Sequence, residues 1–255
     1  MKNLACLIST ASILAIAAPA NALYTFSASS GATVDPAGTL VAGSNDTNEV
    51  VSVTVPFNFS IYSNPVAANS TIRVSTEGNI QFVSTGGSIA SSNTGLLATT
   101  FGSNVVVVMP YWDNLNLNTT GGGIYTSTSG TAGNQIFAIE WRGRHSTETA
   151  LQTLNFEVRF FEGSNNFEIV YGQTGNASSG SALNGASATV GIQQGSAAGS
   201  QFTQYSFNQP TITPGLRLSA TAVPVPFAFS PFTAIALMGA NGVRRVFQAV
   251  KSEKY

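Results

Sequence analysis

The stretch from Asn104 to Asn116, NVVVVMPYWDNLN, constrains the fold of this chain more than any other part of it. Val105 to Met109 have no polar face, so this run predicts a strand that is buried on both sides. Pro110 has no N–H to give to a neighbouring strand and is expected to end the ladder. Tyr111 and Trp112, which follow it, are large enough to cap a core.

Alternation of apolar and polar residues predicts strands along most of the chain. Between Leu154 and Phe161 every second residue is apolar, which is typical of a half-buried strand, and Gln135 to Trp141 has the same period. Glu77 to Asn79 is a turn signal, and Glu162 to Asn166 has the length of a hairpin loop. About ten short strands with no convincing helix between them favour an all-β class, an antiparallel β-sandwich.

The charge content excludes one class of partner. Only 8% of the residues are charged, against about 25% in an ordinary soluble protein, so solubility rests on Ser, Thr, Asn, Gln and Gly. The segment from Leu23 to Val223 holds ten of the eleven acids but five of the ten bases. Five scattered arginines cannot neutralise a run of phosphates, so nucleic acid is not expected as a partner.

The first 22 residues have the pattern of a signal peptide. Lys2 precedes an apolar stretch, and Ala20-Asn21-Ala22 fits the small-x-small rule for cleavage before Leu23. A signal helix is therefore predicted here, with an N-terminal membrane anchor as the alternative. The only cysteine, Cys6, lies inside this leader, so the exported part has no disulfide and no thiol chemistry.

Composition divides the rest of the chain into three segments. Residues 23–49 are rich in Ser, Gly, Thr and Asn and predict an irregular lead-in with room for one edge strand. Residues 50–222 hold the β-sandwich. Residues 223–255 contain PVPFAFSPF, a short hydrophobic helix that is a candidate transmembrane segment, Phe227 to Val243 (17 residues), and the charges of Arg244 and Arg245. The basic end would stay in the cytoplasm.

Candidate ligands for a metal or a sugar lie around the central stretch. Asp113, Asn114 and Asn116 offer oxygen atoms to Ca²⁺, although an Asn-rich structural turn accounts for the same residues. No other cofactor is indicated. If exposed, the rings of Tyr111, Trp112 and Trp141, together with Tyr125, could stack on a sugar.

Residues that resemble catalytic groups have simpler structural explanations. Glu140, Glu157 and Glu168 could supply a glycosidase acid pair, but a solvated charge ladder on the outer face of the sheet is the simpler explanation. His145 is the only histidine, and no G-x-S-x-G elbow accompanies it. The sequence therefore favours a protein that is not an enzyme. Asn-x-Ser/Thr sequons begin at five positions, namely Asn45, Asn58, Asn69, Asn118 and Asn176.

The C-terminal segment resembles the PEP-CTERM class of bacterial sorting signals. The resemblance is carried by the motif residues Pro226, Phe227, Phe229, Ser230 and Pro231, by the apolar run that follows, and by Arg244-Arg245. It implies transient retention in the membrane, recognition by an exosortase-type transpeptidase, and delivery to the cell surface or the extracellular matrix.

Residues 50–220 are similar to a β-sandwich module of secreted bacterial proteins that is related to the nidogen-type extracellular domain. The motifs that carry this similarity are Ser75–Phe82, Pro110–Asp113, Phe137–Trp141, Phe160–Gly163 and Ala188–Gln193. Those modules often carry further acids where Asn114 and Asn116 stand here.

Three hypotheses for function follow from the sequence. The first is a non-enzymatic bacterial β-sandwich of the surface or matrix, exported by Sec and sorted by its tail. The second is a carbohydrate-binding or adhesive module whose partner is extracellular polysaccharide, and the third is a secreted hydrolase. Exposure of Trp112 and Trp141 would separate the first two, and two carboxylates in a cleft would favour the third.

Overall fold

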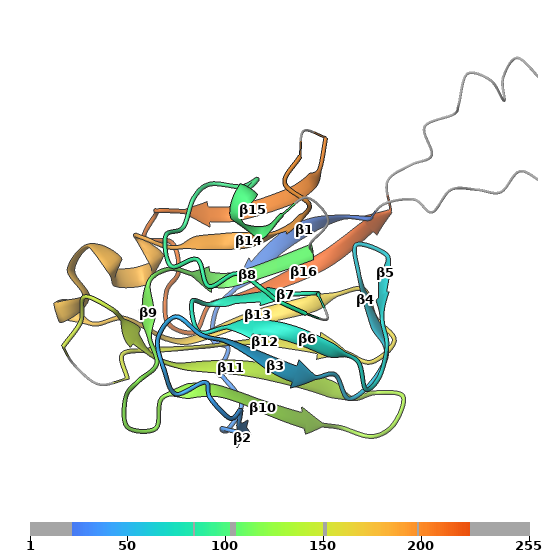
Figure 1. Cartoon of the computed structure of the whole chain (residues 1–255), viewed down its shortest axis with the longest axis horizontal. Helices are drawn as coiled ribbons and strands as arrows, with labels where there is room; N and C mark the ends of the chain where they lie inside the picture. The colour runs from blue at the N-terminus through green and yellow to red at the C-terminus, as the bar shows by residue number, and fades with distance from the viewer. Residues whose placement is uncertain (1–21, 84, 103–105, 150–151, 198, 225–255) are drawn as a thin grey trace, which may run out of the picture. The chain divides into compact units, whose positions relative to one another are not determined.

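Two antiparallel sheets account for most of the part of the chain that the computed structural model describes, residues 22–83, 85–102, 106–149, 152–197 and 199–224 (Figure 1). The larger sheet has eight strands in the order β1-β16-β13-β12-β11-β10-β2, with β9 pairing with β11. Its strands are β1 (Ala22–Ser29), β2 (Thr39–Leu40), β9 (Leu115–Asn116), β10 (Gly123–Ser129), β11 (Ile136–His145), β12 (Leu154–Phe161), β13 (Phe167–Thr174) and β16 (Arg217–Pro224).

The second sheet has six strands in the order β15-β14-β8-β7-β6-β3. Its strands are β3 (Val50–Thr54), β6 (Thr71–Ser75), β7 (Asn79–Gln81), β8 (Val106–Trp112), β14 (Thr189–Gln194) and β15 (Gln201–Phe207). A separate hairpin, β4 (Phe59–Ile61) with β5 (Asn64–Val66), and two 3₁₀ segments, η1 (Thr99–Phe101) and η2 (Ala177–Gly185), complete the described residues.

The predicted all-β antiparallel sandwich is confirmed. The described residues form sixteen strands where about ten were expected, because five of these strands have only two or three residues and are too short to show a period of two. The predicted signal helix and the predicted C-terminal hydrophobic helix lie outside the described residues. Within the described residues, no helix is long and apolar enough to cross a membrane.

Strand β8 is buried along its whole length, as the apolar run predicts. Val106 and Val108 face the core between the two sheets. Val107 and Met109 face the other way, into a second apolar cluster with Ala98 and Phe101. Ala98 and Phe101, which lie between β7 and β8 in the chain, therefore cover part of the outer face of the six-stranded sheet.

Pro110 does not end the ladder, contrary to the expectation from its missing N–H. Strand β8 continues to Trp112, and the register against β14 shifts between Met109 and Trp112. Such a bulge leaves one residue unpaired, so the proline costs no ladder hydrogen bond. It also reverses the alternation, so that Tyr111 joins the core between the sheets while Trp112 joins the outer cluster.

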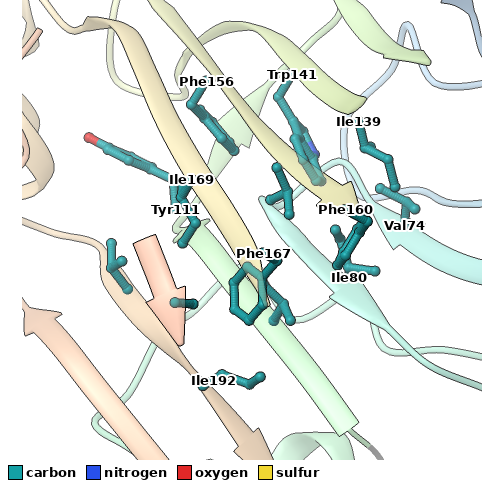
Figure 2. Close-up of a cluster of buried hydrophobic side chains, with 14 of the residues drawn as sticks. Val74, Ile80, Tyr111, Ile139, Trp141, Phe156, Phe160, Phe167, Ile169 and Ile192 are labelled. Carbon is teal, nitrogen blue, oxygen red and sulfur yellow. The ribbon is translucent and has the colours of Figure 1, made fainter. Parts of the chain in front are cut away.

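Aromatic rings fill the space between the two sheets (Figure 2). Phe156 of β12 stacks on Tyr111 of β8, with ring centroids 5.4 Å apart, and on Trp141 of β11 at 5.0 Å. Phe160 stacks on Phe59 of the β4–β5 hairpin at 4.6 Å. Rings from both sheets and from the hairpin thus form one core, as the alternation in β11 and β12 predicts.

The lead-in of residues 23–49 is part of the sandwich. Strand β1 pairs with β16 along all eight of its residues, from Ala22 opposite Pro224 to Ser29 opposite Arg217. The segment therefore supplies an edge strand of the larger sheet. The first and last described residues lie side by side, and the folded unit begins well before residue 50.

Candidate functional site

A segment of residues 30–38, which we call the strap, crosses the outer face of the eight-stranded sheet. It leaves β1 at one edge and reaches β2, which pairs with β10, at the other. A Cβ built on Gly172 of β13 would lie 3.3 Å from Val34, and one built on Gly38 would lie 2.0 Å from the carbonyl oxygen of Thr126. These close approaches show that the strap lies directly on the sheet.

Under the strap lies a buried ionic cluster that links β12 to residues far away in the sequence. Glu157 is 1% exposed. Its Oε2 accepts a hydrogen bond of 3.1 Å from the backbone N–H of Asp35, and its Oε1 accepts one of 2.5 Å from Nε of Arg159. Arg159 also donates to Oδ1 of Asp35 and to the carbonyl of Thr33, both at 2.8 Å.

Burial raises the pKa of Glu157 from 4.5 to about 7. The positive charge of Arg159 opposes this shift, and the negative charge of Asp35 adds to it. Loss of hydration is the dominant cause because the strap removes water from a carboxylate that has only one cationic neighbour to compensate.

Glu140 lies directly opposite Glu157 in the register of β11 and β12 and is 3% exposed. Its Oε1 accepts a hydrogen bond of 2.8 Å from Nε of Arg142 and another from Nδ2 of Asn155. The guanidinium of Arg142 in turn lies 5.2 Å from the ring centroid of Tyr125 on β10, within the range of a cation–π contact.

The prediction of a solvated charge ladder on this face is wrong for two of the three acids. Glu140 and Glu157 are buried, and only Glu168, with its side chain 20% exposed, borders solvent, 3.8 Å from Nε of Arg217. The sequence could not show this burial because the strap that covers Glu157 is more than 100 residues away along the chain.

A polar surface cavity of about 200 Å³ lies beside this cluster. Its lining residues come from β11, β12, β13 and the loop before β12, and they are Arg142, Gln152, Leu154, Asn155 and Gln173. Neither Glu140 nor Glu157 lines it. The two adjacent carboxylates therefore do not form the acid pair in a cleft that a glycosidase needs.

A second polar cluster holds one end of the sandwich together around Asp113. Oδ1 of Asp113 accepts a hydrogen bond of 2.8 Å from the N–H of Asn114 and lies 3.4 Å from Nε2 of His145, and Oδ2 accepts one of 2.6 Å from Ser187. Glu77, fully buried, accepts from the N–H groups of Leu115 at 2.8 Å and Asn48 at 3.1 Å.

Burial also raises the pKa of Glu77, against the lowering effect of those two backbone hydrogen bonds. Its neighbour Gly78 has a φ of +73°, and a Cβ there would lie 1.9 Å from the carbonyl oxygen of Tyr111. The turn predicted at Glu77 to Asn79 therefore packs so closely on β8 that it requires glycine.

The side chains of the candidate calcium ligands bond within the protein or are exposed. Both oxygens of Asp113 are engaged as described, Asn114 is exposed, and the side-chain oxygen of Asn116 accepts the N–H of Asn118 at 2.9 Å. In the part of the chain that the structure describes, no group of three or more His, Cys, Asp or Glu side chains is placed to hold a metal ion. The hydrogen bonds that Asp113 and Asn116 accept from backbone N–H groups are of the kind found in Asn-rich turns.

His145 is oriented by the turn in which it lies. Its Nδ1 lies 2.7 Å from the hydroxyl of Thr147, and its Nε2 faces Asp113. Ser187 bonds to Asp113, and no hydrogen bond joins it to His145. This arrangement does not activate a serine nucleophile, because the acid stands between the serine and the histidine.

Three of the four rings expected to stack on sugars are inside the protein, and the fourth, Tyr125, is half-buried. Trp112 and Trp141 are 0% exposed and Tyr111 is 1% exposed. Each polar ring atom is satisfied internally: the indole N–H of Trp112 donates to Ala90, that of Trp141 donates to Ser75, and the hydroxyl of Tyr111 donates to Ala182. No sugar can reach these rings while the protein is folded.

Sequence reasoning missed the residues that shape this outer face. Asp35 lies in a segment without periodicity, and Gln152, Asn155 and Gln173 are amides of a kind that is common throughout the chain. The alternation in β12 places Asn155 on the outer face, and this was the only feature of the sequence from which one of these residues could have been predicted. The sorting-motif residues Pro226, Phe227, Phe229, Ser230 and Pro231, and the charges of Arg244 and Arg245, lie outside the described residues.

The fold and these two clusters define a β-sandwich module stabilised by buried polar groups. A family model described as NIDO related matches residues 23–231, and the chain belongs to this family. The match supports the nidogen-type module expected from the sequence. No curated protein and no solved structure matches the chain significantly.

Proposed function

We propose that this protein is a non-enzymatic structural module of the bacterial cell surface or extracellular matrix, exported by Sec and sorted through its C-terminal segment. The observation that carries the proposal is the burial of Trp112 and Trp141, which favours a scaffold over a module that binds sugars through aromatic stacking. Membership of the NIDO-related family supports an extracellular setting.

The distribution of charge supports the same function. Half of the ten acids between Leu23 and Val223 are buried, namely Glu77, Asp113, Glu140, Glu148 and Glu157. The solvent-facing surface is therefore dominated by neutral polar side chains. Such a surface stays hydrated without strong long-range fields, which suits a component of a crowded matrix.

The ends of the folded unit agree with processing at both termini. The family match begins at Leu23, the residue expected to follow signal cleavage, and β1 begins within one residue of it. Strand β16 ends at Pro224, where the segment resembling a sorting signal starts. Removal of both flanking segments would leave the paired strands β1 and β16 almost complete.

Lysine content provides a sharp test of this processing. The chain has lysines only at positions 2, 251 and 254. Protein cut before Leu23 and within the tail would carry a single primary amine, its own α-amine. If only the signal peptide is removed, the α-amine, Lys251 and Lys254 make three. We expect one amine-reactive label per chain by mass spectrometry of protein recovered from its host.

Variants of the tail test whether the motif directs the processing. Replacing Phe227 and Phe229 by Ala should yield chains with three labels, whereas Phe232→Ala, outside the motif, should still yield one. Deleting residues 244–255 removes the charge that holds the terminus inside, so unprocessed protein should be released or stalled. Mature surface protein that retains Arg244 and Lys254 would instead establish a simple C-terminal membrane anchor.

A further inference from the structure

The polar cavity on the outer face of the eight-stranded sheet lies along one row of the strand register. Arg142 of β11 pairs with Asn155 of β12, and Asn155 pairs with Gln173 of β13. Gln152, in the loop before β12, closes one end. At about 200 Å³ the cavity has room for roughly six or seven waters, which is the size of one small polar ligand.

Arg142 is held in place but keeps hydrogen-bonding capacity free. Its Nε is bonded to Glu140 and its guanidinium lies beside Tyr125, so its orientation is fixed. Its two terminal nitrogens make no hydrogen bond to the described residues. A guanidinium presents such nitrogens as a planar fork that matches a carboxylate with two parallel hydrogen bonds.

The amide side chains around Arg142 present acceptors as well as donors. Nδ2 of Asn155 donates to the carboxylate of Glu140, and Nε2 of Gln152 donates to the carbonyl of Thr120, so both amides are oriented with their oxygens free. Gln173 is exposed and makes no side-chain hydrogen bond to the described residues. The lining side chains therefore include one guanidinium fork, two amides whose oxygens make no hydrogen bond to the described residues, the free amide of Gln173, and apolar Leu154.

We propose that this cavity binds the ring of an acidic sugar, a uronate unit of an extracellular polysaccharide. The carboxylate of the sugar would bond to Arg142, its hydroxyl groups would donate to Asn155 and Gln152, and Gln173 would bond to a further hydroxyl. Sulfate has no donors and would leave the two amide oxygens unpaired. A neutral sugar would leave the fork of Arg142 unused.

The charges around the cavity are compatible with an anionic ligand. The carboxylate of Glu140 is engaged by Arg142 and Asn155, and that of Glu148 accepts a hydrogen bond from Thr153. Arg144 follows two residues along β11 on the same face and donates to the carbonyl of Thr149 at 3.0 Å. Glu157 lies opposite Glu140, two pairs along the register from Arg142 and Asn155, and beneath the strap.

Glucuronate and glucose form a matched pair of probes because they differ only in the carboxylate at C6. Titrations of the full-length chain, in mild detergent, should detect binding of glucuronate, with glucose and sulfate each at least about tenfold weaker. Equal binding of glucose or of sulfate would overturn the proposal, as would the absence of binding by any of the three.

Variants locate the binding within the cavity. Gln173→Glu should weaken glucuronate binding about tenfold by placing a like charge in the cavity, without loss of any internal hydrogen bond. Arg142→Lys, which keeps the charge but loses the fork, should have a similar effect. Gln209→Glu, an exposed amide on the turn after β15, is the matched control and should bind normally. Unchanged affinity in Gln173→Glu would refute the assignment.

This inference names a partner for the proposed matrix module and rests on that proposal only for the extracellular setting. The titrations measure the affinity of the purified chain for glucuronate. The number of amine-reactive labels per chain instead reports which ends of the chain have been removed. A protein processed at both ends that does not bind glucuronate would remove this inference alone. A protein that binds glucuronate but keeps its tail would remove only the sorting proposal.

Discussion

Trp141 of β11 and Phe156 of β12 lie directly opposite each other in the strand register, and their rings stack at an interplanar angle of 14°. The indole N–H of Trp141 donates to the carbonyl of Ser75 in the other sheet, at 2.9 Å. This pair therefore joins neighbouring strands within one sheet and also connects the two sheets.

Trp112 fills the second apolar cluster, so its removal should be costly. We expect Trp112→Ala to lower the free energy of unfolding by about 3–5 kcal/mol, because a large aromatic side chain is lost from a site with no exposed surface. Phe202→Ala, at a ring that is 43% exposed, should change it by less than about 0.5 kcal/mol. Urea denaturation of both variants measures the difference, and similar values for the two would contradict the packing described.

Gly78 tests the close approach between the β6–β7 turn and β8. Gly78→Ala should be at least about 2 kcal/mol more destabilising than Gly133→Ala. Both glycines have positive φ, +73° and +89°, but only a Cβ at Gly78 meets a backbone atom, whereas nothing lies within 4 Å of one at Gly133. Because both variants carry the strain of a positive φ, the difference between them measures the steric contact. Equal falls in the unfolding temperature of Gly78→Ala and Gly133→Ala would exclude the contact as the cause.

The buried Glu157 should make stability depend on pH in an unusual direction. Its folded pKa, about 7, lies above the ordinary value of 4.5. The folded state therefore binds more protons at Glu157 in this interval, so the contribution of Glu157 to stability should be greatest below about pH 4.5 and be lost as the pH rises to about 7. The full effect is roughly 3 kcal/mol.

Glu157→Gln is the matched variant for this pH dependence. It keeps the shape of the side chain without the charge, so most of the fall between pH 4.5 and 7 should disappear, with a smaller fall left from the raised pKa of Glu77. Chemical denaturation at several pH values provides the measurement. Identical pH profiles for the variant and the natural protein would exclude Glu157 as the source.

Removing the first strand and the strap should unfold the domain. Residues 22–224 alone should give a far-UV circular dichroism spectrum dominated by β-structure, because all described strands lie within them. Residues 50–224 lack β1, which pairs with β16 along eight residues, and lack the strap that covers Glu157. A cooperative unfolding transition of equal stability in the shorter chain would show that the lead-in is dispensable.

The sequence by itself determined the fold class and the position of many strands. Alternation between Leu154 and Phe161 placed β12 with its observed bounds, and the apolar run before Pro110 placed a strand buried on both sides. These features are local: a period of two records which side of a strand meets the core, whatever the partner strand is.

Only the tertiary structure decided which polar and aromatic residues are accessible. The bulge at Pro110 sends Tyr111 and Trp112 to opposite sides of their sheet, and the strap buries Glu157 although its strand alternates like a half-exposed one. The cavity beside Arg142 likewise joins residues from three strands and a loop. Burial of a side chain depends on what covers it, and here the cover comes from segments without periodicity that are distant in sequence.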